Sequence, residues 1–190
     1  MSSPKPSLIT PVEYLALERK SEFRSEYIAG RMFAMSGASR RHGLIAGNLF
    51  GEIWSSLRGK GCEVHINDLR VKVSPTGMYT YPDIVALCGE PQLEDEHLDT
   101  LLNPTVIVEV LSESTEAYDR GEKFAHYRRL DTLREYVLVS QDKIRIERFR
   151  REGDEWTLSE VSGPDATLHL ESIDCHVTVA AIYEKVEFNP

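Results

Sequence analysis

An acidic residue inside an apolar strand constrains this chain more than any other feature of its sequence. Residues 104–111 read PTVIVEVL, and apolar side chains at both alternating positions leave neither face of the predicted strand polar. A strand with this pattern is covered on both sides of a sheet. Glu109 lies within it, and a buried ionised carboxylate costs several kcal/mol unless it is paired or binds a metal. The sequence therefore requires a compensating group close to Glu109.

Helical and strand patterns alternate along the N-terminal half of the chain. Thr10 begins a short helix with a capping box. Residues 26–35 predict two short strands around a turn at Ala29-Gly30, where glycine can adopt a positive φ. Apolar side chains recur at helical spacing between residues 41 and 57, which predicts the longest helix.

The remaining patterns predict a mixed sheet. The acidic stretch 89–103 is expected to be a solvated connection, and helices are expected at about 115–130 and at 177–186. Strands are predicted at 62–66, 69–73, 81–87, 134–140, 143–151 and 155–161, the first three as successive neighbours in one sheet. This order of elements predicts an α/β fold with a central mixed β-sheet flanked by helices.

Length and composition limit the classes of protein to consider. A chain of 190 residues suits one sizeable core, so we expect a flexible lead at residues 1–9 and a single domain at 10–190. There is no apolar run of membrane-spanning length and no apolar segment in the lead, which predicts a cytoplasmic protein with no membrane partner.

Cysteines and net charge exclude two further kinds of site. Cys62, Cys88 and Cys175 are far apart and odd in number, so we expect them to stay reduced rather than to form a disulfide framework. The net charge of -9 argues against a surface that is positive overall. A surface that binds phosphate groups must therefore be local.

A second carboxylate is expected beside Glu109. Asp83 follows Pro82 at the start of the apolar stretch YPDIVAL, residues 81–87, and the two acids meet only if their strands are neighbours. Two carboxylates at the ends of adjacent strands, with a main-chain carbonyl beside them, are the hard oxygen ligands that Mg²⁺ prefers. A divalent cation would then compensate Glu109.

Lys123 adds a positive charge to this arrangement. Lys123 and Tyr127 stand at i and i+4 on the predicted helix, and a helix that follows the Glu109 strand packs back across it. An ammonium group in that place can orient a water molecule and stabilise charge that develops on a phosphate. The two acids and the lysine together indicate hydrolysis of phosphodiester bonds.

Six ordered blocks of the sequence resemble the Uma2 family of endonucleases, within the PD-(D/E)xK restriction-endonuclease-like superfamily. The resemblance covers nearly the whole chain and implies a restriction-endonuclease-like fold and a metal-dependent endonuclease that acts on DNA. The blocks are TPVEYLALE, SEYIAGRMFAMSGAS with His42, YPDIVAL, VIVEVLSEST, DRGEKFAHYRRL and LREYVLV.

The resemblance assigns the main site residues. It makes Pro82-Asp83 the PD element and Glu109 the second acid. The superfamily pattern has a lysine two residues after the second acid, where this chain has Leu111. Similarity to Uma2 proteins implies that the following helix supplies this lysine instead, as Lys123.

The resemblance also points to two residues outside the main motif. Glu26 is implied as a further metal ligand or as the group that holds a water molecule. His42 is implied as a phosphate contact or a proton shuttle.

These assignments lead to a specific expectation. Asp83, Glu109 and the Val110 carbonyl are expected to bind Mg²⁺ or Mn²⁺, and Lys123 is expected to position the attacking water molecule. Cleavage of duplex DNA requires two such sites on opposite strands, which predicts a homodimer.

Structural interpretations compete with the catalytic one. Glu109 and Lys123 could form a buried salt bridge, and Asp83 could cap local backbone N–H groups. Glu26 and His42 could be an ordinary strand-edge acid and a surface histidine. The chain would then be a non-catalytic binding or scaffold protein with the nuclease fold. A third interpretation keeps the nuclease and makes RNA its substrate.

The basic residues are also open to two interpretations. Charged and apolar side chains alternate along KIRIERFRRE, residues 143–152, so this strand could present a solubilising face or a surface for DNA phosphates. Further basic residues that could contribute to such a surface are Arg40, Arg41, Arg120, Arg128 and Arg129.

Overall fold

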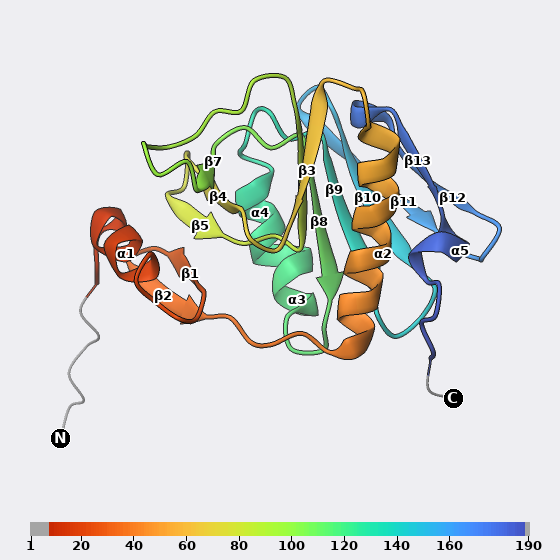
Figure 1. The fold of residues 1–190 in the computed structure, drawn as a ribbon, viewed down its shortest axis with the longest axis horizontal. Coiled ribbons are helices and arrows are strands. Elements are labelled where there is room, and N and C mark those ends of the chain that lie inside the picture. The colour runs from red at the N-terminus through yellow and green to blue at the C-terminus, as the bar shows by residue number, and fades with distance from the viewer. Residues whose placement is uncertain (1–7, 189–190) are drawn as a thin grey trace.

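A six-stranded mixed sheet is the middle layer of the structure, a computed structural model that describes residues 8–188 (Figure 1). The strand order is β11-β10-β9-β8-β6-β3, in which β8 and β9 run parallel and the other neighbours antiparallel. This confirms the predicted α/β fold with a central mixed sheet. The strands are β3 (Cys62–Ile66), β6 (Ile84–Cys88), β8 (Val106–Leu111), β9 (Glu135–Ser140), β10 (Ile146–Glu152) and β11 (Glu155–Val161).

One face of this sheet is covered by the long helix α2 (Arg40–Leu57) and a C-terminal hairpin (Figure 1). Val106, Val108 and Val110 of β8 belong to the apolar core on this side. The hairpin, which the sequence patterns did not reveal, pairs β12 (Thr167–Leu170) with β13 (Cys175–Thr178). The predicted closing helix is much shorter than expected, because Val177 lies in β13 and α5 spans only Val179–Ile182.

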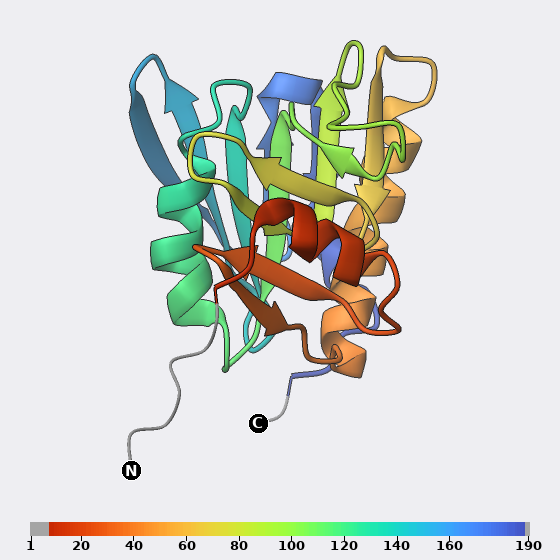
Figure 2. The same ribbon diagram turned by 90° about the vertical axis from the view of Figure 1, so that its left-hand side faces the viewer.

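A second, five-stranded sheet covers part of the opposite face (Figure 2). Its order is β2-β1-β5-β4-β7. Its side chains pack with Ile107 and Leu111, which lie on the face of β8 opposite to α2. The expectation of three successive neighbouring strands at 62–87 is therefore wrong, because the chain leaves the first sheet after β3 and returns to it only at Ile84. The strands are β1 (Ser25–Ile28), β2 (Arg31–Ala34), β4 (Arg70–Val73), β5 (Met78–Thr80) and β7 (Thr100–Leu101).

A short, interrupted helix packs on the same face as the second sheet. The predicted helix at 115–130 is divided into α3 (Glu116–Tyr118), a π-helical turn η1 (Asp119–Lys123) and α4 (Phe124–Tyr127). Phe124, Tyr127 and Leu130 are buried as their spacing predicts. A π-helical turn inside a helix is uncommon and frequently marks a functional site.

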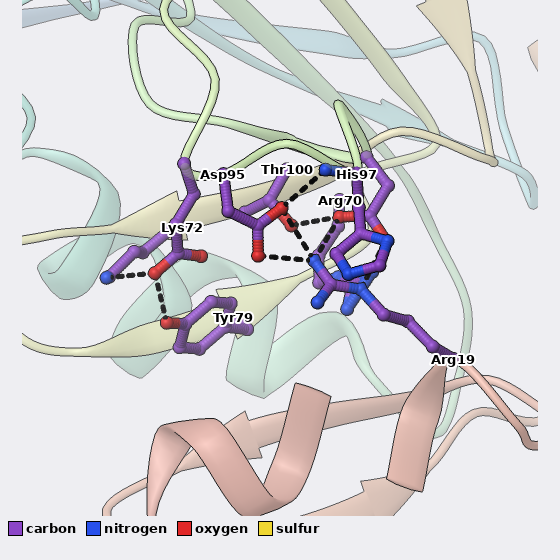
Figure 3. Close-up of polar contacts among 9 residues, drawn as sticks. Arg19, Arg70, Lys72, Tyr79, Asp95, His97 and Thr100 are labelled. Carbon is purple, nitrogen blue, oxygen red and sulfur yellow. Dashed lines mark hydrogen bonds and ion pairs between the residues drawn. The ribbon is translucent and has the colours of Figure 1, made fainter. Parts of the chain in front are cut away.

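The N-terminal helix α1 (Pro11–Glu18) is fastened to the acidic connection by ion pairs (Figure 3). Arg19 Nε lies 2.8 Å from Asp99 Oδ2, and Arg19 Nη2 lies 2.8 Å from Asp95 Oδ2. The buried Arg70 also reaches Asp99 Oδ2, at 2.9 Å. These hydrogen bonds, first those from Arg19, hold the pKa of Asp99 well below its usual range. The acidity of residues 89–103 predicted a solvated connection, but ion pairs hold part of it against α1 and β4.

Two of the three cysteines are joined, contrary to expectation. Cys62 and Cys88 are cross-strand partners on β3 and β6 and form a disulfide, while Cys175 is free and buried. Sequence spacing could not reveal this pair, because Cys88 follows Cys62 by 26 positions and the chain between them leaves the sheet and returns to it. No helix within residues 8–188 is long and apolar enough to cross a membrane. Most of the predicted lead, residues 1–7, lies outside the described residues.

Candidate active site

The ammonium group of Lys123 lies among three carboxylates in the layer between the two sheets. Lys123 Nζ is 2.9 Å from Glu109 Oε1, 3.1 Å from Glu26 Oε1 and 3.6 Å from Asp119 Oδ1. Glu109, Asp119 and Lys123 are only 3 to 6% exposed. The structure thus brings together Glu109, Lys123 and Glu26, which the sequence analysis singled out. It adds Asp119, which the sequence analysis missed.

Strand alternation and helical spacing aim these side chains at one another. On β8, Val108 and Val110 face α2, so Glu109 between them faces the interrupted helix. Lys123 and Tyr127 both reach the same oxygen, because Tyr127 donates a hydrogen bond of 2.9 Å to Glu109 Oε1. The expected shared face of these two helical residues is confirmed.

The second sheet contributes Glu26 from β1 and Thr80 from β5. The Thr80 hydroxyl donates to Glu26 Oε1 and lies 3.2 Å from the Tyr127 hydroxyl. On β1, Tyr27 packs against α1 in a separate aromatic cluster, so the adjacent Glu26 points the other way, toward Lys123. The second sheet therefore places an acid from the N-terminal hairpin in the cluster.

Asp83 lies at the edge of the cluster and is held from two sides. Its strand neighbours that of Glu109, since Ile84 pairs with Val108. Asp83 Oδ2 accepts a hydrogen bond of 2.7 Å from the Val110 N–H, and Asp83 Oδ1 is 2.9 Å from His42 Nε2. The structure therefore brings His42, at the start of α2, to Asp83, a contact that the sequence analysis did not specify.

The acids outnumber the lysine in this cluster. Burial, together with the neighbouring acids Asp119, Asp83 and Glu26, raises the pKa of Glu109 to about 8, although the Lys123 ammonium group opposes this rise. Burial likewise raises the pKa of Asp119. Lys123 remains a cation because the surrounding carboxylates, first Glu109, outweigh the effect of its burial and raise its pKa. One ammonium group does not neutralise the negative charge of the site.

A divalent cation suits this excess of carboxylates. The described residues include no group of three or more His, Cys, Asp or Glu side chains already arranged around a metal position. Mg²⁺ requires only one or two protein carboxylates, since water and phosphate oxygens complete its octahedron. The Val110 N–H faces Asp83, and the N–H and C=O of a strand residue point to the same side, so the Val110 carbonyl is directed there too. Asp83, Glu109 and Val110 thus fit such an ion.

The raised pKa of Glu109 predicts how the stability of the metal-free protein changes with pH. The folded protein keeps a proton on Glu109 up to about pH 8, whereas the unfolded chain releases it near 4.5. The stability from this proton is complete below about pH 4.5 and is lost as the pH rises through 8. We expect Glu109→Gln to leave the free energy of unfolding nearly unchanged near pH 4. At pH 9 it should raise that free energy, by on the order of a few kcal/mol.

Urea unfolding at both pH values, in EDTA, measures this effect. Glu135 of β9 is a suitable control, since it is also fully buried but lies beside Val106, at the other end of β8. Glu135→Gln, measured in the same way, shows what the loss of a buried glutamate outside the cluster does to stability. A Glu109→Gln protein that is less stable than the wild type at pH 9 would contradict the prediction.

Some site residues had a usable sequence signal and others had none. Asp119 precedes Lys123 by four residues, so the helical spacing that linked Lys123 to Tyr127 could have found it. Thr80 gave no signal, because only the packing of the second sheet brings it to the cluster.

The basic strand β10 is neutralised by neighbouring acids. Arg145 pairs with Glu147 and Glu160, and Arg148 lies 3.6 Å from Glu135. Arg150 pairs with Glu152 and Glu171. Among the other candidates, Arg41 reaches Asp142 and Arg120 reaches Glu116 and Glu147. This arrangement favours the solubilising interpretation of β10.

Comparisons with known proteins find similarity along most of the chain. The family model Uma2, described as "Putative restriction endonuclease", matches residues 11–180. Two uncharacterized proteins of Synechocystis sp. (strain ATCC 27184 / PCC 6803 / Kazusa) are similar along most of their length. One is 32% identical over 164 residues, covering 86% of this chain and 93% of its own. The other is 35% identical over 188 residues, covering 98% and 97%.

A solved structure shares the fold. It is the crystal structure of "a putative nuclease belonging to DUF820" from Anabaena variabilis ATCC 29413, with a TM-score of 0.78 and 20% sequence identity. The match covers 94% of this chain and 99% of the other. At this level of identity the likeness is one of fold.

Proposed function

This chain belongs to the Uma2 family, and on that basis we propose that it is an endonuclease that hydrolyses phosphodiester bonds of DNA with Mg²⁺ or Mn²⁺. The observation that carries the proposal is the excess of buried carboxylates around Lys123, with the pKa of Glu109 raised to about 8. Maintaining this charge inside the protein costs stability. If the site binds a cation and a phosphate, this function explains why the protein keeps the carboxylates there despite the lost stability.

Asp83, Glu109 and the Val110 carbonyl are the proposed ligands of the cation. When bound, the ion supplies Lewis acidity at a phosphoryl oxygen. His42 and the Val110 N–H hold the two oxygens of Asp83, so this carboxylate is oriented before any ligand arrives. Hydrogen bonding from Tyr127 fixes Glu109 in the same way.

Lys123 and Glu26 are the proposed residues for the attacking water molecule. Lys123 Nζ donates to this water and stabilises negative charge on the phosphate, and Glu26, 3.1 Å from Lys123, accepts a hydrogen bond from the water and orients it. The water oxygen bonds to phosphorus as the bond to the in-line ester oxygen breaks. One proton of the attacking water passes to the Glu26 carboxylate, and solvent water protonates the departing ester oxygen. If both strands of a duplex are cut, two copies of the chain must act together, so we propose a homodimer for that reaction.

One observation favours a non-catalytic role as the second candidate. The Glu109–Lys123 contact of 2.9 Å is also the ion pair that a purely structural cluster requires. Such a protein would bind partners through the nuclease fold and would gain no stability from divalent metal.

The proposal is tested by incubating the purified protein with supercoiled plasmid, single-stranded DNA and RNA of matched length. We expect cleavage of DNA with Mn²⁺ or Mg²⁺ and none in EDTA. In the same buffers, the metal should raise the melting temperature of the wild type but not that of Asp83→Asn, since a ligand of the folded state stabilises it. Absence of both effects would support the structural candidate, and cleavage of RNA alone would replace DNA as the substrate.

A further inference from the structure

An exposed aromatic ring lies beside Glu26. In the N-terminal hairpin Glu26 is the direct cross-strand partner of Phe33. Direct partners point to the same face of a hairpin, with Cβ atoms about 4.5–5.5 Å apart. Glu26 reaches Lys123, whereas Phe33 is 49% exposed. An uncovered phenyl ring is therefore next to a residue that is proposed to orient the attacking water molecule.

Tyr118 is a second aromatic residue near Glu26. It ends α3, directly before Asp119, and the carboxylates of Asp119 and Glu26 both lie within 3.6 Å of the same Lys123 ammonium group. Burial, and after it the charge of Glu26, raises the pKa of Tyr118. Its buried hydroxyl has no hydrogen-bond partner among the described residues. Leaving such a group unpaired is unfavourable, so a hydrogen bond to a polar atom of a ligand would stabilise the complex.

Basic side chains lie along the same segment. Arg31, also on β2, is the cross-strand partner of Ile28 and so shares the face of Glu26 and Phe33. Arg31 and Arg40 are exposed, and neither forms an ion pair within residues 8–188. Aromatic rings that stack on bases, beside arginines that contact phosphates, are the usual means of binding single strands.

We propose that Phe33 is a platform for one nucleobase next to the phosphate that is cleaved, and that the unpaired Tyr118 hydroxyl hydrogen-bonds to the same ligand. In a regular duplex the base faces are stacked on one another and out of reach. The preferred substrate is therefore single-stranded DNA, alone or within a gap or loop. This inference rests on the proposed nuclease function, and such a substrate needs only one site rather than a pair. A second copy of the chain packed over Phe33 would also cover Glu26, which lies on the same face of the hairpin. A dimer contact at Phe33 is therefore disfavoured.

Binding to a single-stranded oligonucleotide that contains the fluorescent base 2-aminopurine tests the platform. With Ca²⁺ in place of Mg²⁺, we expect wild-type protein to bind this strand more tightly than its duplex and to quench the base. Phe33→Ala should weaken binding about tenfold, since one stacked base is worth about 1–3 kcal/mol. Phe33→Trp should restore the affinity, and Tyr118→Phe should weaken it less than Phe33→Ala.

Trp54→Ala is the matched control. Trp54 is 53% exposed on α2, and it lies 12 residues beyond His42, about 18 Å along the helix axis. This variant should bind like the wild type.

Each other outcome has a distinct meaning. If the wild type cleaves DNA and Phe33→Ala binds the single strand equally well, the platform is overturned and the nuclease function stands. If the wild type neither binds nor cleaves any nucleic acid, both fail. If Phe33→Ala converts a dimer to monomers in ultracentrifugation without weakening DNA binding, Phe33 is a contact between copies, and the inference is wrong.

Discussion

Glu109→Gln is expected to reduce metal-dependent DNA cleavage by about 10³-fold or more, while the protein stays folded. The substitution removes one ligand charge from the proposed cation site, and the Lewis acidity lost with the ion amounts to several kcal/mol of barrier. Because glutamine keeps the shape of the side chain and removes a buried charge, the fold should not suffer. Initial rates of plasmid nicking with Mn²⁺, beside circular dichroism of the same samples, measure both effects.

Glu135→Gln serves as the control for this prediction, because Glu135 is a buried glutamate of the adjacent strand β9 that hydrogen-bonds to Ser172. It should lose stability and retain cleavage. Full activity in Glu109→Gln would remove Glu109 from the metal site and leave it as part of a structural cluster. Equal loss in the two variants would show that the assay reports folding rather than chemistry.

Lys123→Met is expected to have the largest effect on stability. It removes the ammonium group that lies within 3.6 Å of Glu26, Glu109 and Asp119, and leaves three buried or nearly buried acids without this partner. Removing one partner of a buried ion pair lowers the free energy of unfolding by about 3–5 kcal/mol. Cleavage should also be lost, because the group that orients the attacking water molecule is absent.

The pH dependence identifies the cause of this loss. The acids take up protons more readily once Lys123 is gone, so urea unfolding should show a smaller deficit at pH 5 than at pH 7.5. Lys60→Met is the control, since Lys60 pairs with the exposed Asp174 and surface pairs contribute about 0–1 kcal/mol. A deficit that does not depend on pH would indicate lost packing rather than unpaired charge.

The parts of the site that lie within one strand or one helix could be predicted from sequence. Glu109 was conspicuous because charge is costly in an apolar strand, and Lys123 with Tyr127 followed from helical spacing. Resemblance to a family added Glu26 and His42, and the structure places Glu26 on Lys123 and His42 on Asp83. Their chemical roles, like those of Asp83 and Glu109, stay predictions until the variants are measured.

Contacts across the chain could not be predicted in this way. The patterns at 62–87 marked β3, β4 and β6 but not their partners, so β4 was assigned to the wrong sheet. The short strand β5 and the Cys62–Cys88 pair were missed. The helix expected at 115–130 contains a π-helical turn at its centre. In this turn the side chains of Asp119 and Lys123 both point toward Glu109. In each case side-chain periodicity was read correctly, but packing from distant segments decided the result.

By itself, the sequence determined the long helix and the strands of the central sheet, and it required a partner for the charge of Glu109. Both follow from local physics, because periodicity sets which faces are apolar and burial makes an unpaired charge unfavourable. Only the tertiary structure decided which groups meet that charge. Glu26 and Thr80 arrive from a second sheet and Asp83 from an adjacent strand, because strand pairing depends on the packing of the whole chain rather than on any local pattern.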